Sequence, residues 1–177
     1  MTRIPLITER TDDLSKEQTE VFDRVVESRG RMIRPFGVLL HAPEIARHVA
    51  ELGAQIRYGS SLSDHDRELV IIATGSSHGC DYVWDSHLPL AKAAGVADTT
   101  IDYLQGRDAP ALPNTDLPKT DSLLIEFVRG LCGGSSVSEQ VFEAARDELG
   151  DSGVVELSAT IGYYTLMGYV MTSAGAC

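Results

Sequence analysis

The stretch that decides the fold is SDHDRELVIIATGSSHGCDYVWDSH, residues 63–87. Ser63 and Asp66 stand at the spacing of a helix capping box, directly before an almost wholly apolar run. The letters LVIIAT alone are also compatible with a strand, but the strong N-terminal cap favours a buried helix. A turn at Ser77–Gly79 then separates this helix from a second one that begins near Cys80. The stretch therefore predicts two consecutive helices joined by a short turn.

The rest of the chain also shows helical periodicity. Residues 41–59 carry Ile45, Val49, Leu52 and Ile56 as one apolar stripe, and Pro89 is expected to bend or divide the helix that starts at Cys80. Further helices are predicted at residues 15–28, 98–106, 117–132, 138–149 and 151–174. No alternating strand pattern persists, so we expect an all-α domain of seven to eight helices.

Composition excludes several classes of protein. The formal charge is −11, with 26 acidic against 15 basic residues, which argues against nucleic-acid binding. No run approaches the roughly 18 apolar residues of a membrane span, and the first residues do not resemble a signal peptide. We therefore expect a cytoplasmic protein with no membrane partner. Three widely spaced cysteines argue for reduced thiols rather than a disulfide framework.

We expect one domain over residues 1–177, because neither side of the proline-rich segment 107–119 holds a complete core pattern of its own. That segment is interpreted as a surface loop. A weak internal echo places Glu-Leu near the head of two apolar helices, at Glu68 and Glu156, which allows a degenerate repeat of residues 63–95 and 151–176.

The residues able to do chemistry gather in the opening stretch. Cys80 and His87 are seven apart and would share one helix face, with Cys80 near the helix N-terminus, where the dipole favours a thiolate. Glu68 lies in the apolar helix before them. A charged carboxylate there costs several kcal/mol without a partner, and His87 is the natural one. We therefore predict that Glu68, Cys80 and His87 meet in one enclosed pocket.

Eleven residues separate Glu68 from Cys80, and six separate Cys80 from His87. This spacing, together with the segment CDYVWDSHLPLAKAAGV, resembles the carboxymuconolactone decarboxylase and alkylhydroperoxidase D-like family. The peroxidase branch has Glu, Cys-x-x-Cys and His. Here Val83 replaces the second cysteine, so disulfide cycling within this motif is excluded. The decarboxylase branch has a Tyr-Glu-Trp-like run before the histidine, which Tyr82 and Trp84 match around Val83.

This resemblance implies a compact helical fold, a homo-oligomer (trimer or hexamer) and a cofactor-free lyase or decarboxylase acting on a small carboxylated unsaturated ring or lactone. Glu68 and His87 would transfer a proton, and Cys80 would carry a proton or line the pocket. Tyr82 and Trp84 would form a flat apolar wall of the pocket, and His78 is a further candidate contact. The substrate carboxylate would bind to an arginine: Arg57, Arg67 or Arg34.

Other interpretations remain open at this point. The protein could be a thiol peroxidase that uses Cys80, with Cys132 or an external thiol as resolving partner, or a non-catalytic helical assembly or binding protein. Cys80 could be an inert core residue, and Tyr82 and Trp84 could be core as well. Glu68 could form a structural ion pair with Arg57 or His87. A zinc site of His78, Cys80 and His87 has suitable ligand types but lacks dense ligand spacing, so we predict no metal and no cofactor.

Overall fold

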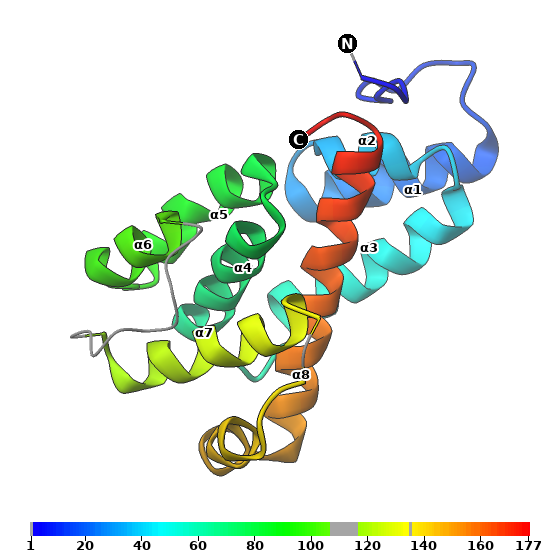
Figure 1. Ribbon diagram of the computed structural model, residues 1–177. Coiled ribbons are helices and arrows are strands. Elements are labelled where there is room, and N and C mark those ends of the chain that lie inside the picture. The colour runs from blue at the N-terminus through cyan, green and yellow to red at the C-terminus, as the bar shows by residue number, and fades with distance from the viewer. Residues whose placement is uncertain (1, 107–116, 135) are drawn as a thin grey trace. The chain divides into compact units, whose positions relative to one another are not determined.

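The computed structural model describes residues 2–106, 117–134 and 136–177, and all regular structure within these ranges is helical (Figure 1). The elements are α1 (Lys16–Arg29), α2 (Arg34–Leu39), α3 (Pro43–Tyr58), α4 (Asp64–His78), α5 (Asp81–Ala93), α6 (Asp98–Gln105), α7 (Lys119–Cys132) and α8 (Glu139–Ser173). The all-α prediction is confirmed. Most of the proline-rich segment 107–119 lies outside the described residues, so its interpretation as a surface loop stays a prediction.

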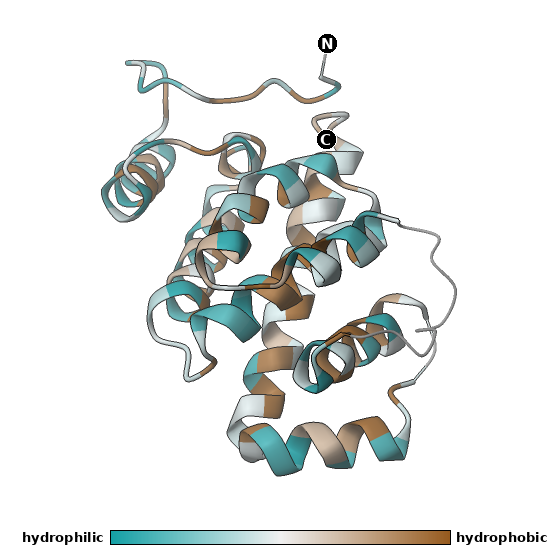
Figure 2. Ribbon diagram, turned by 90° about the vertical axis from the view of Figure 1, so that its left-hand side faces the viewer, coloured by the Kyte–Doolittle hydropathy of each residue, from teal (hydrophilic) through white to brown (hydrophobic). Residues whose placement is uncertain are grey.

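The contacts divide the chain into two compact units. One, here the N-terminal unit, contains α1, α2, α3 and the part of α8 from Leu166 onward; the other, the central unit, is Ser60–Thr165. Figure 2 shows hydrophobic and hydrophilic residues alternating along helices such as α8. Among the described residues no helix is long and apolar enough to cross a membrane.

The central unit is built around α4, which packs against α5, α6 and α7. Every residue of α4 from Glu68 to Ser76 is buried, which explains why this stretch has no polar face in the sequence. The core combines side chains of α4 with side chains from the other helices of the unit and from the segment between α5 and α6: Leu69, Val70, Ile72, Ala73, Trp84, Ala91, Val96, Ile101, Leu104, Leu124, Ile125, Phe127, Val128, Ala145, Val154, Leu157 and Ile161.

The predicted helix pair in residues 63–87 is confirmed, and the strand alternative is wrong. The Ser63 side chain accepts a hydrogen bond from the Asp66 amide and caps α4, and Gly79 ends this helix with a φ of 63°. Cys80 is already the N-cap of α5, so the turn is shorter than expected and consists of Gly79 and Cys80. A left-handed residue at this position suits glycine, which has no Cβ to clash.

Pro89 does not divide α5, contrary to one of the two outcomes we expected. The helix runs from Asp81 to Ala93 with Pro89 inside it. Proline cannot donate to the carbonyl of Asp85, four residues earlier, but both residues are exposed, so water can satisfy that carbonyl.

Two expectations for the N-terminal unit need correction. Helix α2 was not predicted, because its six residues are too few to show a period; Pro35 lies in its first turn, where proline is tolerated. On α3, Val49 is buried, as expected, but Ile45 and Leu52 are 57% and 46% exposed. The predicted stripe is therefore only half correct, because α1 and α2 cover one side of α3.

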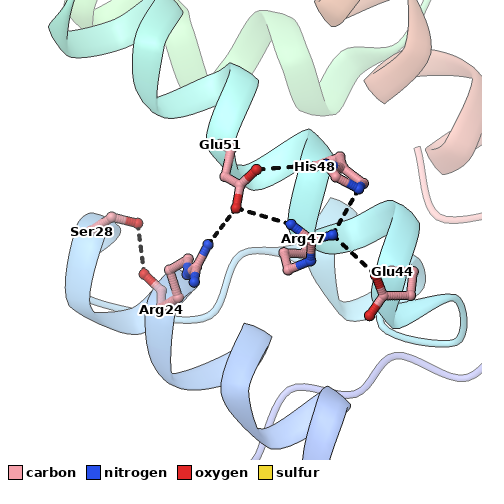
Figure 3. Close-up of polar contacts among 6 residues, drawn as sticks. All are labelled: Arg24, Ser28, Glu44, Arg47, His48 and Glu51. Carbon is pink, nitrogen blue, oxygen red and sulfur yellow. Dashed lines mark hydrogen bonds and ion pairs between the residues drawn. The ribbon is translucent and has the colours of Figure 1, made fainter.

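Charged side chains join α1 to α3 at the surface of the N-terminal unit (Figure 3). Arg24 Nη1 of α1 lies 2.7 Å from Glu51 Oε1 of α3, and the same oxygen lies 3.3 Å from Arg47 Nη1. Arg47 also contacts Glu44 at 3.1 Å and His48 at 2.8 Å. Because these groups are largely exposed, the network fixes the register of the two helices more than it adds stability.

Helix α8 contains a sharp kink. Gly150 has a φ of 71° and a ψ of 173° and joins two helical stretches, residues 139–149 and 151–173. The predicted helix end at Gly150 is confirmed.

Candidate functional site

Glu68 and His87 form a buried hydrogen-bonded pair in the central unit. His87 Nδ1 of α5 lies 2.8 Å from Glu68 Oε2 of α4, and the two residues are 7% and 5% exposed. A carboxylate can only accept, so the imidazole donates through Nδ1 and its Nε2 is left for other partners. The contact predicted from the sequence is therefore present.

Arg67 approaches the other oxygen of the same carboxylate. Its Nε lies 3.7 Å from Glu68 Oε1, and its Nη2 donates to Asp64 Oδ1 at 2.7 Å. The Nε atom is buried and makes no hydrogen bond. Glu68 thus lies between an imidazole and a guanidinium that retains an unused donor, which is a suitable arrangement for an anionic ligand.

Tyr164 of α8 contacts the imidazole of His87. The two ring centroids are 5.0 Å apart and the rings are nearly perpendicular, at 82°. Tyr163 packs in the same way against Tyr164, with centroids 5.2 Å apart. The sequence analysis missed Tyr164 as a site residue, because a tyrosine within a long apolar helix is typical of a core position.

Cys80 is completely buried at the N-cap of α5 and is disulfide-bonded. The expectation of reduced thiols is therefore wrong for this residue. Burial of the N-terminal end of α5 shields Cys80 from bulk solvent, so a reactive thiol at this position first requires reduction of the disulfide.

Cys132 is a free cysteine at the end of α7 and is partly buried. Burial raises the pKa of its thiol, although a hydrogen bond with Thr165 acts in the opposite direction. Thr165 Oγ1 also lies 2.8 Å from His78 Nε2, and burial lowers the pKa of His78. His78 therefore points to α8, and Cys132 favours the neutral thiol over a reactive thiolate.

The remaining predicted contacts are more scattered. Trp84 lies in the core cluster and is 7% exposed, so its placement favours the core interpretation, and Tyr82 is partly buried on α5. Arg57 and Arg34 belong to the N-terminal unit, where the Arg57 guanidinium lies 5.6 Å from the ring centre of Tyr58. Of the three candidate arginines, Arg67 belongs to the same unit as Glu68 and contacts it.

Val83 stands where the peroxidase pattern has its second cysteine. It is 3% exposed and packs against α4 at Gly75, where an added Cβ would lie 3.0 Å from Val83 Cγ1. In residues 2–106, 117–134 and 136–177, no group of three or more His, Cys, Asp or Glu side chains is arranged to hold a metal ion.

Comparisons with known proteins agree with this arrangement. The family model "Carboxymuconolactone decarboxylase family" matches residues 43–112, which include Glu68, Cys80 and His87. No curated protein matches the sequence.

Three solved structures share the fold. A peroxidase-related protein with an alkylhydroperoxidase AhpD core from Ralstonia eutropha JMP134 has a TM-score of 0.77 at 19% identity, covering 99% of this chain and 91% of that one. The debrominase Bmp8, in a cysteine-to-alanine variant with 2,3,4-tribromopyrrole, has a TM-score of 0.75 at 11% identity over 100% and 93%. A peroxidase-related protein from Silicibacter sp. TM1040 has a TM-score of 0.73 at 17% identity over 98% and 90%. Residues 43–112 are thus similar to the carboxymuconolactone decarboxylase family, and the chain shares its all-helical fold with the alkylhydroperoxidase D-like proteins.

Proposed function

We propose that the protein is a cofactor-free lyase that removes CO₂ from a small carboxylated unsaturated ring or lactone by proton transfer at His87. The observation that carries this proposal is the buried 2.8 Å hydrogen bond between His87 and Glu68. A buried acid–base pair in contact with a third ionisable group is typical of catalytic sites.

The chemistry follows from the substrate class. When the bond between the ring and its carboxylate breaks, the electron pair moves into the conjugated system toward the lactone carbonyl, and a carbon atom must then receive a proton. His87 would first take up a proton from water on Nε2 and then deliver it to that carbon, while Glu68 holds the ring through Nδ1 and stabilises the positive charge of the doubly protonated imidazole. A positioned general acid typically contributes about 10²–10⁴ in rate.

Arg67 would anchor the substrate by an anionic group. Its buried Nε lacks a hydrogen-bond partner, and an unsatisfied buried donor is costly unless a ligand takes it. An oxyanion at this position would form a charge-assisted hydrogen bond beside the Glu68–His87 pair.

The test uses carboxymuconolactone as the probe and measures CO₂ release by the wild type, Glu68→Gln and His87→Gln. Both variants are expected to lose about 10²-fold or more in kcat while they keep the wild-type circular dichroism spectrum. Glu156→Gln is the matched control, because Glu156 also lies on an apolar helix and accepts hydrogen bonds, from Ser60 and Ser61, away from the pair. Wild-type turnover in Glu68→Gln would contradict the proposal, and destabilisation without a specific loss of kcat would favour a non-catalytic role for the pair.

A second candidate is a thiol-dependent enzyme that uses Cys80. The favouring observations are the position of Cys80 at the N-terminus of α5 and the fold shared with the debrominase Bmp8 and with peroxidase-related proteins. Reduced Cys80 would attack a hydroperoxide O–O bond, giving an alcohol and a sulfenic acid that an external thiol then reduces.

Dependence on a reductant distinguishes the two candidates. Thiol chemistry requires prior reduction of Cys80 and disappears in Cys80→Ser, whereas proton transfer by His87 continues without added thiol. Alkyl hydroperoxide and 2,3,4-tribromopyrrole are the probes for this arm, with consumption of the added thiol as the measurement. No thiol consumption by the reduced wild type with either probe would exclude this candidate for both substrates.

A further inference from the structure

Helix α8 contacts both histidines that flank Cys80 in the sequence. Tyr164 packs its ring against His87, and the next residue, Thr165, forms a hydrogen bond with His78. The segment lies far along the chain from α4 and α5, yet all these residues belong to the central unit. The contact with His87 has no explanation in the proposed proton transfer, which uses Glu68 and the imidazole alone.

The imidazole of His87 needs two constraints to present Nε2 in one direction. The hydrogen bond from Nδ1 to Glu68 fixes one atom of the ring at 2.8 Å. It does not lock the ring, because the imidazole can still rotate about Cβ–Cγ and abandon that bond. A second group must therefore contact the ring from another side.

We infer that Tyr164 is a positioning residue that holds the plane of the His87 imidazole and so directs Nε2 toward the substrate. The two rings are 5.0 Å apart at 82°, which is the edge-to-face geometry that aromatic rings prefer. Tyr164 is itself 5% exposed and is held by Tyr163 at 79°. The contact is thus made by a buried ring with little freedom to move away.

The expected effect of Tyr164 on the rate rests on the proposed function, whereas its effect on the orientation of the His87 ring does not. Displacement of a catalytic group by about 1 Å can cost about 10²-fold in rate. We expect Tyr164→Leu to lower kcat on carboxymuconolactone by about 10²-fold with a nearly unchanged KM, and Tyr164→Phe, which keeps the ring, to retain activity.

The decisive measurement is the tautomer of His87 in protein labelled with ¹⁵N-histidine, read from two-bond proton–nitrogen correlations and assigned with His87→Gln. At a pH where the ring is neutral, the wild type and Tyr164→Phe are expected to show one tautomer, protonated at Nδ1. Tyr164→Leu is expected to show a mixture of tautomers or exchange broadening. The matched control is Tyr163→Leu, since Tyr163 is equally buried and its ring packs against Tyr164, and it should keep the single tautomer.

The outcomes separate this inference from the proposed function. A single Nδ1-protonated tautomer in Tyr164→Leu would overturn the positioning role, whatever the activity. An equal change in Tyr163→Leu would also overturn it, since general loosening of the core would then be the cause. If the wild type does not turn over carboxymuconolactone but Tyr164→Leu still mixes the tautomers, the proposed function fails and the positioning role stands. Should Tyr164→Leu not fold, Tyr164→Met fills the space with an unbranched side chain and replaces it in the same comparison.

Discussion

At the scale of single residues, Glu68 is the most informative position in the chain. It is one of 26 acidic residues, but the five residues that follow it in α4, Leu69–Ala73, are buried and apolar. A carboxylate in such surroundings cannot reach bulk water, so it must be paired inside the protein. Its two oxygens face His87 and Arg67, which gives one side chain contacts to both the proposed proton donor and the proposed anchor.

Replacement of Arg67 by Gln is expected to raise KM for a carboxylated substrate by about tenfold or more, with a smaller effect on kcat, because the loss of one charge-assisted hydrogen bond costs about 1.5–3 kcal/mol. Initial rates over a range of carboxymuconolactone concentrations measure this. The control is Asp64→Asn, which weakens the outer support of Arg67 but keeps its charge. An unchanged KM in Arg67→Gln would show that another group binds the substrate carboxylate.

Cys132 should react slowly with alkylating reagents at neutral pH. Burial raises the pKa of its thiol above the ordinary value of 9.0, so little thiolate is present and the alkylation rate should rise with pH beyond that value. Mass spectrometry after timed exposure to iodoacetamide gives the rate, and the protein unfolded in urea is the control. Rapid alkylation of the folded protein at pH 7 would contradict the prediction and would make Cys132 a better candidate for a resolving thiol.

At the scale of helices, glycine in the left-handed region shapes α8. Gly150→Ala is expected to lower the free energy of unfolding by about 1 kcal/mol, because an L-residue is strained at a φ of 71° although its Cβ would meet nothing within 4 Å. Gly162→Ala is the matched control in the same helix. Its Cβ also meets nothing, but its backbone is helical, so alanine should raise stability by about 0.5–1 kcal/mol.

Urea unfolding followed by circular dichroism measures both changes. Shifts of the same sign in Gly150→Ala and Gly162→Ala would contradict the assignment of the kink to Gly150.

The start of α4 is tied to α8 through Glu156. Its carboxylate accepts hydrogen bonds from Ser60 Oγ at 2.6 Å, from the Ser61 amide at 2.7 Å and from Ser61 Oγ at 3.1 Å. These bonds hold the pKa of Glu156 below its ordinary value of 4.5, and the bond from the Ser60 side chain has the largest effect. Glu156, the second glutamate of the possible internal repeat, thus holds the loop before α4 by hydrogen bonds, whereas Glu68 pairs with His87.

The contribution of Glu156 to the free energy of unfolding should decrease at low pH. Because the folded-state pKa is lower than the unfolded value, the contribution is complete above about pH 4.5 and is lost as the pH falls through the lower folded pKa. Glu156→Gln should therefore cost about 1 kcal/mol at neutral pH and much less at about pH 3. Urea titrations at both pH values measure the difference, with Glu148→Gln, an exposed carboxylate of the same helix, as control. An equal cost at both pH values would show that the charge of Glu156 is not involved.

At the scale of the whole molecule, we propose that the chain forms a homo-oligomer, a trimer or hexamer, in which α8 takes part. Two large apolar side chains three residues apart on α8, Leu166 and Tyr169, are 38% and 61% exposed. Exposed apolar patches on a helix are typical of subunit contacts. Tyr169→Glu is expected to lower the mass measured by light scattering at micromolar concentration, with Asp151→Glu, an exposed charge on the same helix, as control. A monomeric wild type would contradict the proposal.

The sequence by itself determined the helices other than α2, and the central pair. Caps such as Ser63 and breaks such as Gly79 and Gly150 act within a few residues, so local patterns predict them. Glu68 and His87 were also predictable, because a buried charge on one helix needs a partner and the next helix along the chain supplies one across a tight turn.

Other features were decided only by the tertiary structure. Tyr164 against His87, Thr165 against His78 and Glu156 against Ser60 join residues that are 77 to 96 positions apart in the chain. Nothing in a local period encodes such contacts, because they depend on which face of α8 packs against α4 and α5 and at what depth. The choice of Arg67 among three arginines, and the exposure of Ile45 and Leu52 on an apolar stripe, have the same cause: periodicity shows that a helix has an apolar side, but only packing decides what covers it.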